Sequence, residues 1–200
     1  MPRRVILGMT GATGAVFGVE LLRRLREQPD VETHLVLSQW ARATIHLETD
    51  HSVRDVADLA DVTYAWNDQG AAISSGSFPV DGMIIAPCSM KTLAGIRTGY
   101  ADGLIPRAAD VTLKERRPLV LVPRETPLSE IHLENMLALS RMGARIVPPM
   151  PAFYNRPQTV DELVGHIATR VLDQIGIQVP SAQRWDGMPR SSEPKGATSR

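Results

Sequence analysis

The stretch RVILGMTGATGAVFG, residues 4–18, joins a short apolar run to a turn of small residues. An apolar run of this length indicates a buried strand, and the segment after the turn has the pattern of a helix. A strand that passes through a glycine-containing turn into a helix is the opening of a βαβ unit. The helix N-terminus offers unpaired N–H groups to an anion, so the turn is a first candidate site, with an ordinary tight turn as the alternative.

The same alternation of strand and helix patterns continues along the chain. Further apolar runs lie at 32–38, 81–87, 117–123 and 144–149. Amphipathic segments, expected to be helices, lie at 15–27, 39–48, 52–60, 90–98, 106–116, 129–142 and 159–175. This rhythm predicts an α/β fold, with a doubly wound parallel sheet and helices on both of its faces. In the helix at 129–142, we expect Ser129 as N-cap, Gly143 as the stop, and Leu133, Met136, Leu137 and Ser140 as the inward stripe.

Composition limits the class of protein. The chain has 200 residues, of which 43% are hydrophobic, and its 22 basic residues balance 22 acidic ones. Zero net charge argues against binding to nucleic acid or to an anionic membrane surface. The single cysteine, Cys88, excludes an intrachain disulfide, and no apolar stretch approaches the ~20 residues that span a bilayer. The N-terminal stretch has too few apolar residues for a signal peptide, so we expect a cytoplasmic protein.

The domain organisation is expected to be simple. Residues 1–180 would form a single domain, followed by a C-terminal segment, 181–200, that turns polar. Within it, residues 190–200 are expected to be disordered. Trp185 is the exception, because a large aromatic residue beside such a tail is expected to dock on its own domain or on a neighbouring subunit.

Polar side chains gather where the predicted strands end. Ser38 ends the second strand, where a dinucleotide-binding fold would place an acidic residue; a serine there suits the phosphate or ribityl chain of a mononucleotide. The residues 88–92, CSMKT, follow the third strand and open a helix, so their hydroxyls and N–H groups form a second cradle for an anion or a polar ring. The loop ISSGS, 73–77, adds hydroxyls before that strand. Cys88 is expected to be buried and inert, because no base is evident near it in the sequence.

Charged residues stand at both ends of the fourth apolar run, 117–123. Before it, Arg107, Asp110 and Lys114 fall at i, i+3 and i+7 and share one helix face. After it come Arg124 and Glu125. The set suits a local anion, and the alternative is an ordinary solvated helix surface, to which Arg116 and Arg117 are assigned.

Two further candidates lie near the proline-rich turn before the last helix. Tyr154 and Arg170 flank this turn and the helix that follows it. A tyrosine hydroxyl and a guanidinium both donate to phosphate, although each in isolation is more often structural.

Several stretches together resemble one known family. MTGATGA (9–15), LETD (47–50), SSGSF (74–78), PCSMKT (87–92), RAADVTLKERRPLVLVPRETPLSEIHLENM (107–136) and PPMPAFYNRPQT (148–159) are similar to the UbiX-type flavin prenyltransferases. The resemblance implies a Rossmann-like, flavodoxin-like sheet and a homododecamer with active sites at subunit interfaces. It also implies transfer of a dimethylallyl group from dimethylallyl phosphate to N5 and C6 of reduced FMN, with no metal. The product, prenylated FMN, is the cofactor of a UbiD-type decarboxylase, the implied functional partner.

The resemblance implies a role for each matching residue. FMN would be bound by Gly11, Ala12, Thr13, Ser38, Ser89, Met90, Lys91, Thr92 and Arg124. The prenyl phosphate would be bound by Arg107, Lys114, Arg124, Tyr154 and Arg170, with Trp185 at the mouth of the site. The catalytic set would be Thr13, Glu48, Lys114 and Glu125, with Thr13 and Glu48 near flavin N5. Glu125 would balance the cations of the empty site, and it or the departing phosphate would move protons.

Two rival functions follow from the same residues. A cysteine-type decarboxylase of this broad fold carries PASANT and a catalytic histidine, whereas this chain has PCSMKT and no histidine in that setting. A flavin carrier, or a subunit of a large decarboxylase, would not need a second phosphate site. Direct decarboxylation is disfavoured because neither flavin nor these residues offer an electron sink for an aromatic acid. The sequence leaves open which decarboxylase and acid are served, and whether the donor is a monophosphate or a diphosphate.

Overall fold

The computed structural model describes residues 2–179 and Gly187. Its sheet has six strands: β1 (Arg3–Met9), β2 (Val31–Leu37), β3 (Val62–Tyr64), β4 (Gly82–Cys88), β5 (Leu119–Pro123) and β6 (Arg145–Ile146). Neighbouring strands are parallel throughout, in the order β3-β2-β1-β4-β5-β6. Without the three-residue edge strand β3, this is the flavodoxin order, so the predicted fold class is confirmed.

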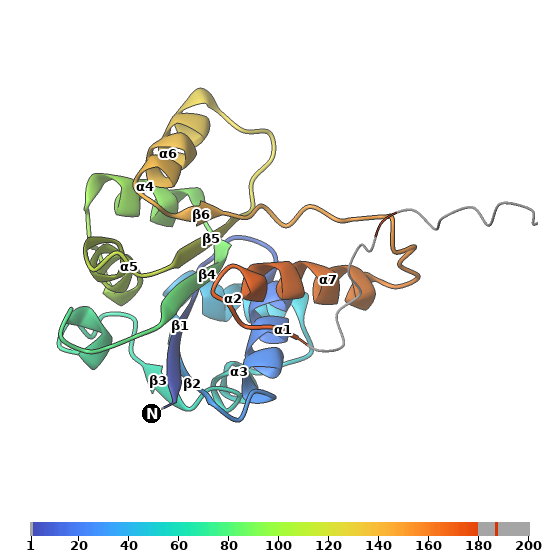
Figure 1. Cartoon of the computed structure of the whole chain (residues 1–200), viewed down its shortest axis with the longest axis horizontal. Helices are drawn as coiled ribbons and strands as arrows, with labels where there is room; N and C mark the ends of the chain where they lie inside the picture. Colours follow the sequence, from blue (N-terminus) through green and yellow to red (C-terminus); the bar gives the residue numbers. More distant parts are fainter. Residues whose placement is uncertain (1, 180–186, 188–200) are drawn as a thin grey trace, which may run out of the picture.

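Helices cover both faces of the sheet (Figure 1). They are α1 (Ala15–Arg26), α2 (Gln39–Glu48), α3 (Val53–Ala57), α4 (Met90–Thr98), α5 (Leu104–Lys114), α6 (Glu130–Arg141) and α7 (Val160–Asp173), with a 3-10 helix η1 at Ala72–Ser74. The alternation of side chains along β1 explains the two layers, because Val5 and Leu7 join one buried cluster and Ile6 joins the other. The first cluster contains side chains of α1, α2, α3 and α7, and the second contains side chains of η1, α4, α5 and α6.

The predicted elements are mostly confirmed, and the differences lie at the sheet edges. The run expected at 144–149 yields only the two-residue β6, because the prolines that follow it cannot donate ladder hydrogen bonds. The edge strand β3 was not predicted, since VTY is too short to stand out as an apolar run. No helix of the described residues is long and apolar enough to cross a bilayer. Trp185 and the segment 188–200 lie outside the described residues.

Helix α6 differs from the prediction in which face it buries. Ser129 accepts a hydrogen bond from the N–H of His132 and caps the helix as expected. The predicted inward stripe is wrong at Leu133 and Leu137, which are each 52% exposed in the single chain, and at the exposed Ser140. Met136 packs against the core as predicted, and the fully buried Leu139 adds an inward contact that was not predicted. The apolar stripe read from the sequence therefore faces away from the core of its own chain.

Candidate functional site

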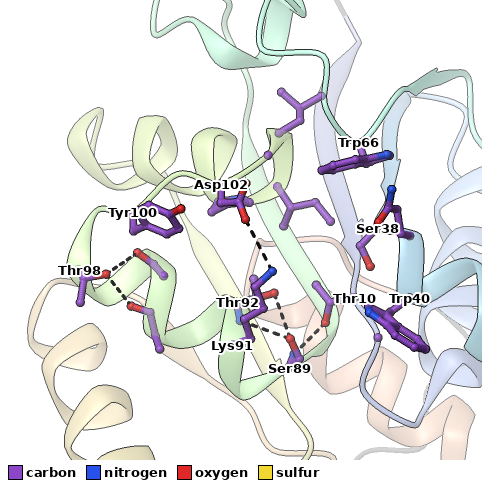
Figure 2. A pocket seen from close by; sticks show the side chains of 18 residues that line it. Thr10, Ser38, Trp40, Trp66, Ser89, Lys91, Thr92, Thr98, Tyr100 and Asp102 are labelled. Carbon is purple, nitrogen blue, oxygen red and sulfur yellow. Dashed lines mark hydrogen bonds and ion pairs between the residues drawn. The ribbon is translucent and has the colours of Figure 1, made fainter.

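A cavity of about 670 Å³ opens at the carboxyl ends of β1, β2 and β4 (Figure 2). Strands β1 and β4 are neighbours whose following helices lie on opposite faces of the sheet, so the cavity occupies the topological switch point. Thr10 and Gly11 follow β1, Ser38 follows β2, and the start of α4 follows β4. Trp66 and residues 100–106 form the opposite wall. The volume is within the range of small-molecule sites, which is about 300–1,000 Å³.

Gly11 is required by the close approach of Trp40. A Cβ added at Gly11 would overlap the Cβ of Trp40, so only glycine lets these two segments pass. Trp40 lines the cavity and is 75% exposed, which leaves its ring free for a ligand to cover. Ala12 and Thr13 continue the turn, and the hydroxyl of Thr13 is exposed, without a partner among the described side chains.

Two helix N-termini point their capping hydroxyls at this cavity. Ser38 Oγ accepts from the N–H of Ala41 at 3.1 Å, which leaves its own O–H proton free to donate. Ser89 Oγ accepts from the N–H of Thr92 at 3.3 Å and donates to Thr92 Oγ1 at 3.1 Å, so the proton of the Thr92 hydroxyl is the free one. Thr10 Oγ1 accepts from the N–H of Ser89 at 2.8 Å and holds the two loops together. Hydroxyl donors at helix N-termini fit the phosphate and polar ring of a mononucleotide such as FMN.

Glu48 ends α2 and stabilises the start of α1. Gly14, at the N-cap of α1, has a φ of 108° and no side chain to satisfy the first N–H groups. Glu48 Oε2 accepts from the N–H groups of Gly14 and Ala15, both at 2.8 Å. A carboxylate at this point also complements the helix dipole.

Other predicted flavin contacts stand on the same edge of the sheet. Lys91 pairs with Asp102 at 3.7 Å across the cavity wall, and both side chains are well exposed. Met90 is half-buried against the core. Arg124 follows β5, and its guanidinium has no partner among the described residues. Glu125 accepts from the N–H of Thr126 at 3.0 Å.

Cys88 is buried directly beside this site without being reactive. Its side chain is fully buried, and burial raises the pKa of the thiol to about 12. A thiol with such a pKa carries almost no thiolate at neutral pH. The prediction of a buried cysteine is therefore confirmed.

Arg107 and Lys114 lie elsewhere. Helix α5 begins at the cavity and ends at the opposite, amino edge of the sheet, about 16 Å away at 1.5 Å per residue. Lys114 Nζ donates to Glu115 Oε1 at 2.7 Å, and this hydrogen bond lowers the pKa of the Glu115 carboxyl. Arg107 donates to Asp110 at 3.0 Å, as the shared helix face predicted. In the single chain Glu115 is the partner of Lys114. The expectation that Glu125 balances the cations of the phosphate site stays a prediction.

Tyr154 and Arg170 form a third group. The segment 147–159 extends away from the sheet, and α7 returns toward it (Figure 1). The hydroxyl of Tyr154 lies 3.4 Å from Nε2 of His166, one helical turn before Arg170 on α7. Arg170 donates to Asp173 at 2.8 Å. One chain therefore does not bring Arg124, Lys114 and Tyr154 together around one phosphate.

Comparison with known proteins identifies the family. The Flavoprotein family model matches residues 1–172. A protein of Streptomyces sp. (strain D7) named "Probable UbiX-like flavin prenyltransferase" is 70% identical over 185 residues, which is 92% of each chain. The chain belongs to the UbiX-type flavin prenyltransferases. Its similarity to a UbiX-type protein extends over 92% of the chain.

Two solved structures of the UbiX type superpose closely on the chain. A dodecameric FMN-dependent UbiX-like decarboxylase from Escherichia coli O157:H7 has a TM-score of 0.91 at 69% identity, covering 92% of this chain and 100% of that one. AnUbiX (PadA1), solved with FMN and dimethylallyl pyrophosphate, has a TM-score of 0.92 at 53% identity, covering 94% of this chain and 100% of that one. The fold is therefore shared with both over most of this chain.

Sequence reasoning missed several residues of this UbiX-type cavity. Trp40, Trp66 and Tyr100 all line it and are partly or largely exposed. Aromatic residues that stay exposed at strand ends are a usable signal, because a ligand ring is what would cover them. Among the described residues, no group of three His, Cys, Asp or Glu side chains is placed to hold a metal ion.

Proposed function

We propose that the chain transfers a dimethylallyl group from dimethylallyl phosphate to N5 and C6 of reduced FMN, producing prenylated FMN for a UbiD-type decarboxylase. The observation that carries this is the cavity at the switch point, lined by two capped helix N-termini, in a chain of the UbiX family. When bound, reduced FMN supplies the electron-rich nitrogen and carbon that accept the prenyl group.

The residues of the carboxyl edge are assigned to the flavin. Gly11, Ala12 and Thr13 lie against it, and Ser38 and Thr92 donate hydroxyl protons toward it. Ser89, Met90 and Lys91 complete the same loop. Glu48 fixes the turn that carries Thr13, because its carboxylate holds the N–H groups next in the chain.

Recognition of the prenyl donor depends mainly on its phosphate. Burying the five-carbon tail contributes about 3–4 kcal/mol at roughly 0.8 kcal/mol per carbon. Each charge-assisted hydrogen bond to the phosphate contributes roughly 1.5–3 kcal/mol, and several cations are available. Arg107, Lys114, Arg124, Tyr154 and Arg170 are assigned to this phosphate. They also stabilise the charge that grows on it as the carbon–oxygen bond breaks.

These phosphate residues meet only if different chains contribute them. Lys114 and Arg124 stand at opposite edges of the sheet, so the complete site requires an assembly. We assign the chain to a homododecamer, as described for the Escherichia coli relative. Exposed apolar side chains on α6 and on the segment 147–159, including Leu133, Leu137, Met150 and Phe153, are the surfaces suited to contacts between copies.

The test is anaerobic incubation of the protein with reduced FMN and dimethylallyl phosphate, followed by mass spectrometry of the released flavin. A gain of one dimethylallyl unit, absent when the prenyl phosphate is omitted, is the expected result. Parallel reactions with the diphosphate measure which donor is preferred. Unmodified FMN bound tightly by the folded protein would instead favour a flavin carrier or a subunit of a decarboxylase.

A further inference from the structure

The loop of residues 74–78, SSGSF, is held by its carbonyl oxygens. Arg117 donates through one guanidinium nitrogen to Gly76 O at 2.8 Å and through the other to Phe78 O at 2.9 Å. Arg107 donates through Nε to Ser74 O at 3.2 Å. Such a two-pronged contact needs the planar fork of an arginine, which a lysine cannot reproduce. The sequence-based assignment of Arg117 to a solvated helix surface is therefore wrong.

The loop held by Arg117 carries the ammonium of Lys114 on its surface. A Cβ added at Gly76 would overlap Glu115 Oε1 and would lie 2.8 Å from Lys114 Nζ, so the hydrogen-bonded pair of Lys114 and Glu115 packs against this glycine. The hydroxyls of Ser75 and Ser77 lie 2.9 Å apart on the same short loop, and both residues are exposed. Lys114, assigned above to the prenyl phosphate, is thus backed by a polar loop whose position Arg117 determines.

The far end of the loop is anchored in a separate cluster. The guanidinium of Arg4 lies 4.7 Å from the ring centroid of Phe78, and His34 packs edge-on at 5.4 Å between centroids. These contacts fix Phe78, but they leave the Gly76 carbonyl to Arg117 alone among the described side chains. The position of Gly76, and with it the support under Lys114, depends on Arg117.

We propose that Arg117 is a positioning residue for the reaction: it fixes the loop 74–78 beneath Lys114, so that the ammonium meets the prenyl phosphate in the correct place. The inference rests on the proposed function. The loop lies at the amino edge of the sheet and the flavin cavity lies at the carboxyl edge. Loss of Arg117 is therefore expected to affect one substrate and not the other. Use of the prenyl phosphate falls, whereas FMN binding does not.

The neighbouring residue provides a matched control. Arg116 is exposed and has no side-chain partner among the described residues, although it borders the same surface depression as Arg117. Arg117→Ala is expected to raise KM for dimethylallyl phosphate by up to about 100-fold, the range that small misplacements produce, with Kd for FMN unchanged. Arg117→Lys is expected to give a smaller rise, since it can bond only one carbonyl. Arg116→Ala is expected to leave both constants unchanged.

A readout without turnover separates this proposal from the proposed function. Hydrogen–deuterium exchange of the peptide covering 74–78 is expected to speed up in Arg117→Ala and to stay unchanged in Arg116→Ala. Faster exchange in Arg117→Ala, together with a wild type that forms no prenylated FMN, would refute the reaction and keep the anchoring role. If Arg117→Ala does not fold, Gly76→Ala displaces the pair of Lys114 and Glu115 from the same loop and is expected to raise KM for the prenyl phosphate as well.

Two results would overturn the proposal. One is equal KM values for Arg117→Ala and Arg116→Ala in variants of equal melting temperature. The other is a parallel loss of FMN affinity in Arg117→Ala or Arg117→Lys, which would indicate a general structural role.

Discussion

The carboxylate of Glu48, at the end of α2, caps the helix that begins beside Gly14. Its Oε2 accepts both of the first N–H groups of α1, from Gly14 and Ala15, at 2.8 Å. Helix N-termini are usually capped by a side chain from the preceding residue, and here that residue is a glycine with positive φ. The capping group comes from another helix, so the end of α2 is fixed against the start of α1.

Removing this cap should destabilise the protein. We expect Glu48→Ala to lower the free energy of unfolding by about 2 kcal/mol, because two charge-assisted hydrogen bonds to backbone donors are lost. Glu48→Gln should lose less, since the amide oxygen still accepts. Urea unfolding followed by circular dichroism measures both, with Glu134→Ala, on the exposed surface of α6, as control. An equal loss in the control would contradict the capping role.

Gly11 should tolerate no side chain while Trp40 is present. Gly11→Ala is expected to cost about 1–3 kcal/mol through overlap with the Trp40 Cβ, and so to weaken FMN binding by about 10- to 100-fold. Fluorescence titration with FMN measures the change. The double variant Gly11→Ala/Trp40→Gly should recover part of the loss, because the overlapping atom is gone. Strictly additive losses would show that the contact is not the cause.

Stability should depend on pH through His34. Burial lowers the pKa of this imidazole below its ordinary value of 6.5, although the neighbouring carboxylate of Glu32 opposes the shift. His34 therefore binds a proton more weakly in the folded state than in the unfolded chain. Its contribution to the free energy of unfolding is fully present above pH 6.5 and is lost as the pH falls below that value. Unfolding free energies measured from pH 7.5 to 5 should fall for the wild type and change less for His34→Gln.

The same experiment separates His34 from its partner. Burial opposes a lowering of the Glu32 pKa, but hydrogen bonds from His34 and Arg4 outweigh it, so Glu32 stays below its ordinary 4.5. Its contribution is lost only in more acidic solution, outside the window tested. His46→Gln, an exposed histidine on α2, is the control and should follow the wild type. A wild type with stability constant over this window would refute the assignment.

Cys88 should resist thiol reagents in the native protein. Full burial and a pKa of about 12 leave neither access nor thiolate. We expect no reaction with 5,5′-dithiobis(2-nitrobenzoic acid) in native buffer, and release of one thiol equivalent per chain in urea. Rapid native labelling would show that β4 opens at its carboxyl end.

Lys114→Ala and Arg124→Ala should complement each other. Each variant alone should use the prenyl phosphate poorly; Lys114→Ala should still bind FMN with wild-type affinity, because Lys114 stands at the edge away from the cavity. Refolding a mixture of the two should restore part of the activity, since some sites then receive both intact residues from different chains. Refolding each variant alone is the control. No recovery in mixed assemblies would place both residues of a site in one chain.

Much of the fold was predictable because its signals are local. The turn after β1, the N-cap at Ser129 and the buried Cys88 all follow from short patterns, and the structure has them as predicted. The edges of the sheet were not predictable. β3 is three residues long, and the prolines after β6 prevent further strand pairing.

The site was harder to predict because it depends on tertiary contacts, which short sequence patterns do not show. Glu125 was expected to balance the cations of a site that one chain does not assemble, and in the single chain Lys114 pairs with Glu115. Arg117 resembled solvated charge, and only the tertiary contact with the loop 74–78 shows its role. Sequence spacing indicates which residues share a helix face, but it does not show which backbone carbonyls of other segments lie within hydrogen-bond distance of them.

Helix α6 keeps little of its apolar surface for its own chain. Leu139 is fully buried, while Ile131, Leu133 and Leu137 are at least half exposed. A helix held by so few internal contacts has low local stability when the chain is alone. Where copies meet through this face, ordering of α6 and association become a single equilibrium. Protein concentration then affects the folding of this helix, and dilution should loosen α6 before it loosens the central sheet.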